Sequence, residues 1–190
     1  MSWPKRARKG KPTDRSRIRT HAGRVLAAAA VTAPVVMATP AAAAPPPPPP
    51  PCLTSDLALS WAPGGTAVSG GRNPGTQQTA VVTLRNLERF SCMLDGFPKV
   101  TLAQGATTET LTDQRSATHT AVTLEPGKAA RFTLTFLAAQ SGDDGVIEPV
   151  TAIVTPPNNT ASKNLRWRWG PVTEQESATR PGNFVGPVHN

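Results

Sequence analysis

The strongest constraint on the fold is a segment in which apolar and polar side chains alternate one by one. In residues 130–136 the apolar positions are Ala130, Phe132, Leu134 and Phe136, and the positions between them are Arg131, Thr133 and Thr135. Successive side chains of a β-strand point to opposite faces, so this pattern predicts a strand with one buried face and one exposed face.

Shorter segments with β-branched residues or the same alternation occur on both sides of this one. They predict strands at 57–61, 79–85, around Cys92 and Leu94, and at 99–103, 120–124, 150–155 and 165–169, with 184–185 as a candidate terminal strand. Turn residues separate them, including Gly64-Gly65, Glu125-Pro126-Gly127 and Pro156-Pro157. No helical stripe is present, so we expect an all-β fold: an antiparallel, immunoglobulin-like β-sandwich of seven to eight strands.

The N-terminal segment has the layout of an export signal. Nine of the 20 Lys and Arg residues lie in 1–24, followed by an uncharged, Ala-rich run at 25–38 and an A-x-A site at 41–43. A membrane-spanning helix needs about 20 apolar residues, and this run is shorter and contains Pro34. We therefore predict a signal peptide at 1–43 and no transmembrane segment.

The export route and the final location follow from two details. No Arg-Arg pair precedes the apolar run, which favours the general secretory route over twin-arginine export. Cys52 follows seven prolines instead of the apolar run, so we expect a secreted, extracellular product, with or without association with the cell envelope, that is not lipid-anchored.

The rest of the chain divides into a spacer and one domain. Pro45 to Pro51 would form an extended polyproline rod of about 20 Å, and we interpret residues 44–51 as a spacer rather than as a ligand for an SH3-like partner. The length allows one β-sandwich domain at 52–176, with 177–190 as a C-terminal tail or terminal strand. Beyond residue 24, eleven basic residues balance eleven acidic ones, which argues against nucleic acid as a partner.

Cys52 and Cys92 are the two cysteines, and both lie beyond the predicted cleavage site. In an exported chain this predicts an intramolecular disulfide. A redox pair is disfavoured because there is no C-x-x-C motif, and a metal site is disfavoured because the histidines are distant. We expect neither a metal nor a cofactor.

Four motifs give the domain a family resemblance. They are C-x-x-x-D-L at 52–57, C-x-L-x-G-F-P-x-V at 92–100, V-x-L-x-P-G at 122–127 and V-x-P-P at 154–157. Residues 52–157, and by extension 165–169, resemble an actinobacterial exported family catalogued as a domain of unknown function, number forty-two thirty-two. That family usually has tyrosine at the position of Phe97. The resemblance implies a secreted β-sandwich with Cys52 and Cys92 paired, and it implies no reaction.

The motifs of common hydrolases are absent from the sequence. There is no G-x-S-x-G and no H-E-x-x-H, and we interpret His119 as a solvated loop residue rather than a catalytic base. Asp143-Asp144 is interpreted as a solvated turn rather than a calcium loop. The loop carboxylates Glu109, Glu125 and Glu148 keep glycoside hydrolysis open as an alternative.

Three tryptophans supply the sharpest binding hypothesis. Trp167 and Trp169 lie two residues apart and would share one strand face; Trp61 lies on another predicted strand. If the rings face outward, they could stack on sugars of a cell-wall glycan; if they face inward, they are core, which is the commoner fate. Arg166 and Arg168 would then lie on the opposite face, as solvated charges or as an anion site.

The sequence thus predicts a non-catalytic module that binds a cell-wall glycan or an extracellular protein. The alternatives are an envelope hydrolase that uses loop carboxylates, and a purely structural extracellular domain.

Overall fold

A computed structural model describes residues 44–71, 73–175 and 182–190. The predicted signal peptide lies outside the described residues. The strands given below belong to the compact unit Pro45–Asn190. No helix in the described part of the chain has the length and apolar character needed to cross a membrane.

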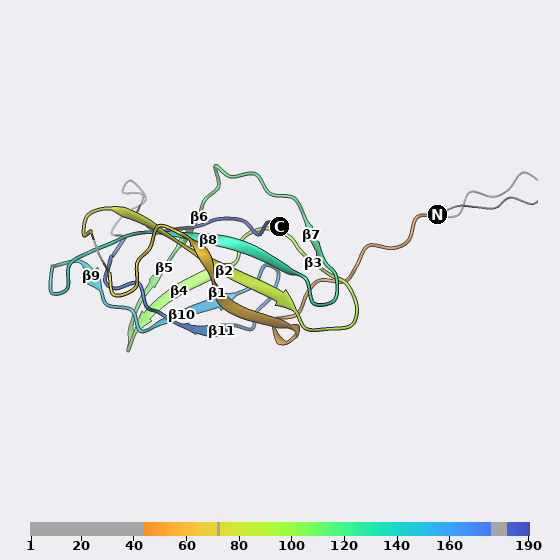
Figure 1. The fold of residues 1–190 in the computed structure, drawn as a ribbon, viewed down its shortest axis with the longest axis horizontal. Coiled ribbons are helices and arrows are strands. Elements are labelled where there is room, and N and C mark those ends of the chain that lie inside the picture. Colours follow the sequence, from red (N-terminus) through yellow and green to blue (C-terminus); the bar gives the residue numbers. More distant parts are fainter. Residues whose placement is uncertain (1–43, 72, 176–181) are drawn as a thin grey trace, which may run out of the picture. The chain divides into compact units, whose positions relative to one another are not determined.

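The largest sheet has five strands in the order β1-β2-β8-β13-β6 (Figure 1). Their bounds are β1 Leu57–Gly65, β2 Gln77–Asn86, β8 Ala129–Leu137, β13 Phe184–Val185 and β6 Thr112–Asp113. Neighbouring strands are antiparallel except β13 and β6, which are parallel.

The second sheet has four antiparallel strands in the order β11-β10-β4-β5. Their bounds are β11 Lys163–Arg166, β10 Thr151–Thr155, β4 Lys99–Gln104 and β5 Thr107–Thr110. Two small antiparallel sheets pair β3 Cys92–Leu94 with β7 Val122–Leu124, and β9 Val146–Ile147 with β12 Val172–Thr173. A single 3₁₀ turn, η1 Thr54–Asp56, precedes β1.

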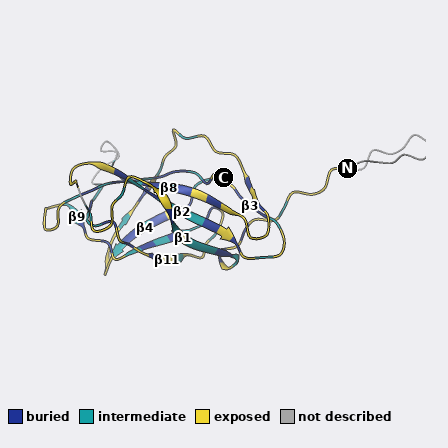
Figure 2. Cartoon of the chain, in the orientation of Figure 1, coloured by how far each residue is buried: buried dark blue, intermediate teal, exposed yellow. Residues whose placement is uncertain are grey.

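The alternation of β8 produces the core. Its apolar residues are fully buried, and the two larger sheets contribute to one hydrophobic cluster (Figure 2). The inward residues are Ala130, Phe132, Leu134 and Phe136 from β8, Ala80, Val82 and Leu84 from β2, Val100 and Leu102 from β4, and Ala152 and Val154 from β10. The predictions of an all-β chain and of strands in these segments are confirmed.

Four strands were not predicted: β5, β6, β9 and β12. The β5 segment consists of three threonines and Glu109, and its threonines are exposed, so it carries no apolar alternation. The other three strands have two residues each, too short for a periodic signal.

The start of the loop after β1 also differs from the prediction. Gly64 and Gly65 belong to β1, where the register with β2 shifts between Ala62 and Gly65. Gly65 has a φ of 81°, and a Cβ there would lie 2.3 Å from the carbonyl oxygen of Thr79. Only glycine allows this close approach, which is a common use of glycine at a bulge.

Both ends of the domain segment pair with strands. Met93 donates its N–H to the carbonyl of Pro50 (2.8 Å), and Cys52 donates to the carbonyl of Met93 (3.0 Å), so the last prolines of the predicted spacer lie alongside β3. At the other end, Phe184–Val185 form β13 between β8 and β6. The candidate terminal strand is therefore confirmed.

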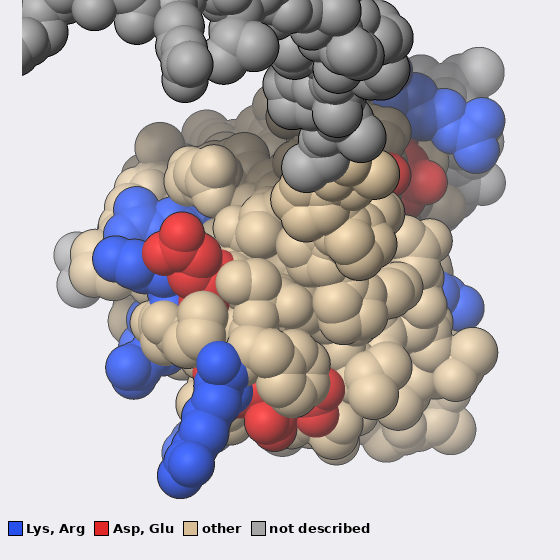
Figure 3. All heavy atoms as spheres, turned by 90° about the vertical axis from the view of Figure 1, so that its right-hand side faces the viewer, with Lys and Arg blue, Asp and Glu red and all other residues tan. Residues whose placement is uncertain are grey.

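The face seen from the right of Figure 1 carries mixed charges. In Figure 3, basic and acidic side chains lie next to one another around a broad neutral area. This view shows no extended basic patch.

Candidate functional site

A disulfide joins the start of the domain to β3. Cys52 and Cys92 are bonded, with their Cα atoms 4.8 Å apart, and both are almost completely buried. The predicted pairing is confirmed.

The tryptophans point into the domain. Trp167 and Trp169 are 5% and 8% exposed and belong to the core cluster, while Trp61 is half-buried against it. Trp61 makes edge-on contacts with both rings, at centroid distances of 5.8 and 5.6 Å, and Trp167 makes one with Phe136 at 5.0 Å. The alternation after β11 turns these rings toward β1 and β8, so Trp167 and Trp169 are core residues and offer no exposed platform for a sugar.

The outer side of this segment carries the two arginines. Arg166 and Arg168 are exposed, and the Arg168 guanidinium lies 4.5 Å from the centre of the Trp169 ring. This cation–π contact covers Trp169 from the solvent side. Two indole N–H groups donate to carbonyls, that of Trp61 to Arg166 (2.9 Å) and that of Trp167 to Gly170 (2.7 Å).

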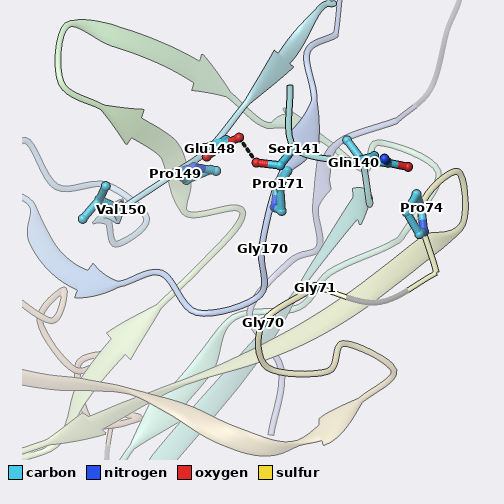
Figure 4. Close-up of a pocket in the computed structure, with 11 residues that line it drawn as sticks. Gly70, Gly71, Pro74, Gln140, Ser141, Glu148, Pro149, Val150, Gly170 and Pro171 are labelled. Carbon is cyan, nitrogen blue, oxygen red and sulfur yellow. Dashed lines mark hydrogen bonds between the residues drawn. The ribbon is translucent and has the colours of Figure 1, made fainter. Parts of the chain in front are cut away.

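A pocket of about 530 Å³ is lined in part by Gly170 and Pro171, the two residues that follow Trp169 in the sequence. Four parts of the chain line it: residues 70, 71 and 74, and the segments 139–141, 148–150 and 170–171 (Figure 4). They come from the β1–β2 loop, the connection after β8, the segment after β9 and the segment before β12. Strand β8 thus delivers one wall of the pocket at its C-terminal end.

Close backbone packing holds two of these walls together. Gly71 and Gly170 have φ angles of 68° and 90°, and a Cβ on Gly170 would lie 2.6 Å from the Cα of Gly71. Gly70 donates its N–H to the carbonyl of Arg168 (2.8 Å), and Ala139 donates to that of Pro171 (3.1 Å). Glycine is required at this contact because a side chain on either residue would separate the loops.

One carboxylate lines the pocket. The hydroxyl of Ser141 donates to Glu148 Oε1 (Figure 4), and the backbone N–H of Glu148 donates to Gln104 Oε1 at 2.8 Å. In the turn that follows Ser141, Asp143 and Asp144 are exposed. The pocket therefore combines a positioned carboxylate with walls of proline, glycine, alanine and valine.

The other candidate carboxylates lie elsewhere. Glu109 accepts hydrogen bonds from the side chain of Asn183 and the backbone of Gln175, each at 3.2 Å. Glu125 precedes the N-terminal end of β8, whereas Glu148 lines the pocket beyond its C-terminal end. A strand of nine residues spans roughly 30 Å, far more than the roughly 5–9.5 Å between glycosidase carboxyls, so Glu125 and Glu148 do not form such a pair.

The remaining candidates do not reach the pocket lining. His119 Nε2 lies 3.4 Å from Asp95 Oδ1, and its ring meets Phe97 edge-on at 5.4 Å. Within the described ranges, no three His, Cys, Asp or Glu side chains gather in a way that could hold a metal ion, and this includes Asp143 and Asp144.

Sequence reasoning missed three asparagines that tie loops together. Asn86 is fully buried and donates to the carbonyls of Phe90 and Leu124, and Asn159 donates to that of Cys52. Asn183 donates to the carbonyl of Thr173 and accepts from the N–H of Leu137. Asparagine is usually a solvent-exposed residue, so the order of residue types in the sequence does not distinguish these structural amides from solvated ones.

The pocket was missed for a related reason. The turn residues Gly70-Gly71 and Gly170-Pro171, which form two of its walls, are visible in the sequence about 100 residues apart. However, glycine and proline dipeptides mark turns wherever they occur. Nothing in the sequence pattern indicates that these two turns touch.

Comparison with protein families finds a match over most of the described domain. A model described as Domain of unknown function (DUF4232) matches residues 52–188, a range that includes β13. The family resemblance seen in the sequence is confirmed. No curated protein matches the chain.

Proposed function

The chain belongs to the DUF4232 family, and we propose that it is an exported, non-catalytic binding module that holds its ligand in the pocket beyond β8. We propose further that its fold is an immunoglobulin-like β-sandwich. The support is that the two larger sheets share one core, and that a buried disulfide suits an oxidising compartment.

The observation that carries this proposal is the construction of the pocket. Backbone hydrogen bonds and the Gly71–Gly170 contact fix its loops. Pro74, Pro149 and Pro171 restrict the backbone of three wall segments. A rigid concavity of this size is typical of a preformed ligand site, because little ordering entropy is lost on binding.

Binding is favoured over hydrolysis by how the carboxylates are used. Glu109 accepts two structural hydrogen bonds, Glu125 lies at the other end of β8, and Glu148 receives the hydroxyl of Ser141. Glu125 is therefore too far from Glu148 to act with it in glycoside hydrolysis, and Glu109 is engaged in holding Asn183 and Gln175. A purely structural role would give no reason for a braced pocket.

The ligand is proposed to belong to the cell envelope, with cell-wall material as the partner. Since Trp167 and Trp169 face the core, the contacts with the ligand would come from the pocket and not from stacking on aromatic rings. A pocket of about 530 Å³ has room for one residue of a larger polymer.

The test is co-sedimentation of the purified protein with insoluble cell-wall material. Ser141→Trp fills the pocket from an exposed position, and Ser116→Trp adds the same bulk in the loop between β6 and β7. We expect pelleting by the unmodified protein and by Ser116→Trp, and loss of pelleting by Ser141→Trp. If both variants pellet equally, the pocket is not the binding site.

Export has its own test. The intact mass of the protein recovered from culture fluid should correspond to a chain that starts near Ala44 and is two mass units lighter than the reduced form. A mass that includes residues 1–24 would contradict cleavage.

A further inference from the structure

We infer that the protein forms a two-fold symmetric dimer in which the proline arm of each copy docks on an apolar patch of the other. The arm is Pro45 to Pro51, and the apolar patch consists of Leu53, Leu87 and Phe90. This inference goes beyond the proposed function. It concerns the N-terminal end of β8, opposite the pocket, and it does not depend on what the pocket binds.

Exposed apolar side chains gather at this end of the domain. Among the described residues five large apolar side chains are exposed, and three of them are Leu53 (57%), Leu87 (58%) and Phe90 (52%). The backbone of Asp56 links the first two: its N–H donates to the carbonyl of Leu53 (3.0 Å), and its carbonyl accepts from the N–H of Leu87 (2.9 Å). The carbonyl of Phe90 accepts from the buried side chain of Asn86 (2.9 Å). Figure 3 shows a broad neutral area on this end, and such clustering is typical of an interaction surface.

The proline arm begins beside the apolar patch and is itself exposed. Six of its seven prolines are exposed, and Pro49 is half-buried. The base of the arm is fixed to β3, because Met93 donates its N–H to the carbonyl of Pro50 and Cys52 donates to that of Met93. A run of prolines forms a stiff rod of about 20 Å. A stiff rod held at its base does not turn back over Leu53, and the patch is exposed although the arm belongs to the same compact unit.

The arm and the patch have complementary chemistry. Proline-rich rods dock on surfaces with aromatic side chains, and they lose little entropy on binding because their conformation is preformed. The patch offers one phenylalanine and two leucines. Arm and patch lie on either side of Cys52 in the sequence. A two-fold axis near Cys52 therefore brings the arm of each copy to the patch of the other.

The charges at the patch favour a second copy over other occupants. Glu88 and Arg89 lie between Leu87 and Phe90, and neither forms a salt bridge with a described residue. In a two-fold contact, Glu88 of each copy can pair with Arg89 of the other, so the surface is complementary to itself. A lipid surface would instead have to take up the Glu88 carboxylate next to Phe90, and transfer of an unpaired charge into an apolar medium is costly.

The size of the contact indicates the strength of the dimer. Each copy contributes one arm and one patch, so the interface contains two rods of about 20 Å. Such an interface belongs to the small class, below about 1,200 Å² of buried surface, which is typical of weak complexes. Assembly ends at two copies because both arms and both patches are then occupied.

The test is the mass of the protein recovered from culture fluid, measured by analytical ultracentrifugation between about 1 µM and about 1 mM, the range of dissociation constants of weak complexes. We expect the average mass to rise with concentration from that of one copy toward that of two, and no further. An average mass that stays at one copy, or that rises beyond two, would overturn the inference.

Two variants test the two sides of the contact. Leu87→Ser/Phe90→Ser changes the patch, and deletion of Pro45 to Pro48 shortens the arm while the contact of Pro50 with β3 remains. Each should weaken dimerisation by roughly tenfold or more, because every change acts twice in a two-fold interface. Urea unfolding should be nearly unchanged, since the altered residues are exposed.

Val68→Ser is the matched control. Val68 is another exposed apolar residue (44%), and it lies in the loop that follows β1, away from the patch. This variant should dimerise as the unmodified protein does. Dimerisation that survives deletion of the arm, or that is weakened equally by Val68→Ser, would contradict the proposed contact.

A heptaproline peptide isolates the contact between arm and patch. When the peptide is added to the arm-deletion variant, we expect shifts in the backbone amide signals of Leu53, Leu87 and Phe90, and none at Gly70 and Gly170. The same peptide should leave the signals of Leu87→Ser/Phe90→Ser in the arm-deleted protein unchanged. Absence of shifts at the patch would overturn the inference.

Flotation with phosphatidylglycerol vesicles tests the other occupant of the patch. If the protein stays monomeric and floats with vesicles only when Leu87 and Phe90 are intact, a lipid surface covers the patch and the dimer is wrong. Pelleting with cell-wall material reports separately on the proposed function. It should persist in Leu87→Ser/Phe90→Ser, because the pocket lies beyond the other end of β8.

Discussion

The two ends of β8 are stabilised in different ways. At its N-terminal end, the disulfide and the buried amide of Asn86 join β3, β7 and the start of β1 through buried contacts. At its C-terminal end, exposed loops meet through backbone hydrogen bonds and a contact between two glycines, and an exposed Ser141–Glu148 pair is the side-chain link within the pocket lining. We call these the disulfide end and the pocket end.

This difference separates stability from binding. Buried and fully hydrogen-bonded groups are costly to remove, because their partners lose hydrogen bonds without gaining water. Exposed polar groups on a braced backbone can be changed at small cost in folding. The comparison therefore predicts large effects on unfolding at the disulfide end and effects on ligand binding at the pocket end.

The largest effect is expected from removing the disulfide. The double variant Cys52→Ala/Cys92→Ala opens a loop whose ends are 40 residues apart in sequence. The chain-entropy model gives a loss of about 4 kcal/mol in the free energy of unfolding, measured by urea denaturation. In the folded variant, the NMR chemical shifts of the Gly70 and Gly170 backbone amides should equal those of the unmodified protein, because the pocket end does not depend on the disulfide. A loss below about 1 kcal/mol would contradict the assignment of stability to this end.

Asn86→Ala is expected to cost about 3 kcal/mol. The substitution leaves the carbonyls of Phe90 and Leu124 without their donor and the N–H of Glu88 without its acceptor. Denaturation of Asn86→Asp provides the matched comparison, because aspartate restores the acceptor but not the donors. If Asn86→Ala lowers the free energy of unfolding no more than the substitution of an exposed residue does, water has replaced the hydrogen bonds of the amide.

At the pocket end, Gly170→Ala is expected to cost about 2 kcal/mol, because its φ of 90° is unfavourable for alanine and its Cβ would meet the backbone of Gly71. Gly105→Ala is the control, since Gly105 also has a positive φ of 59° but a Cβ added there would have open space within 4 Å. The difference between the two free energies of unfolding isolates the contact. If Gly170→Ala and Gly105→Ala lower the free energy of unfolding equally, the contact between Gly71 and Gly170 contributes nothing to stability.

The smallest effect on stability is expected from Glu148→Gln. An exposed side chain with one hydrogen bond should change the free energy of unfolding by about 0.5 kcal/mol or less. A larger loss of stability would assign Glu148 a structural role and weaken the contrast between the ends.

Local pattern was sufficient where one face of a strand is buried and the other exposed. The alternation in 130–136 located β8 and its inward residues, and Leu165, Trp167 and Trp169 are buried in the alternating order that the sequence shows, although β11 itself ends at Arg166. Pattern failed for β5, whose threonines are exposed, and for the two-residue strands, which pair through backbone groups that every residue possesses.

The sequence by itself determined the all-β class, most of the strands, the cysteine pairing and the family, because these depend on periodicity, residue type and motif spacing along the chain. Only the tertiary structure decided that the tryptophan face is turned inward, that Asn86 is a buried cross-link, and that Gly71 meets Gly170 to build a pocket around Glu148. The physical reason is that these features depend on contacts between segments distant in sequence, and the free energy of such a contact leaves no periodic signal in either segment.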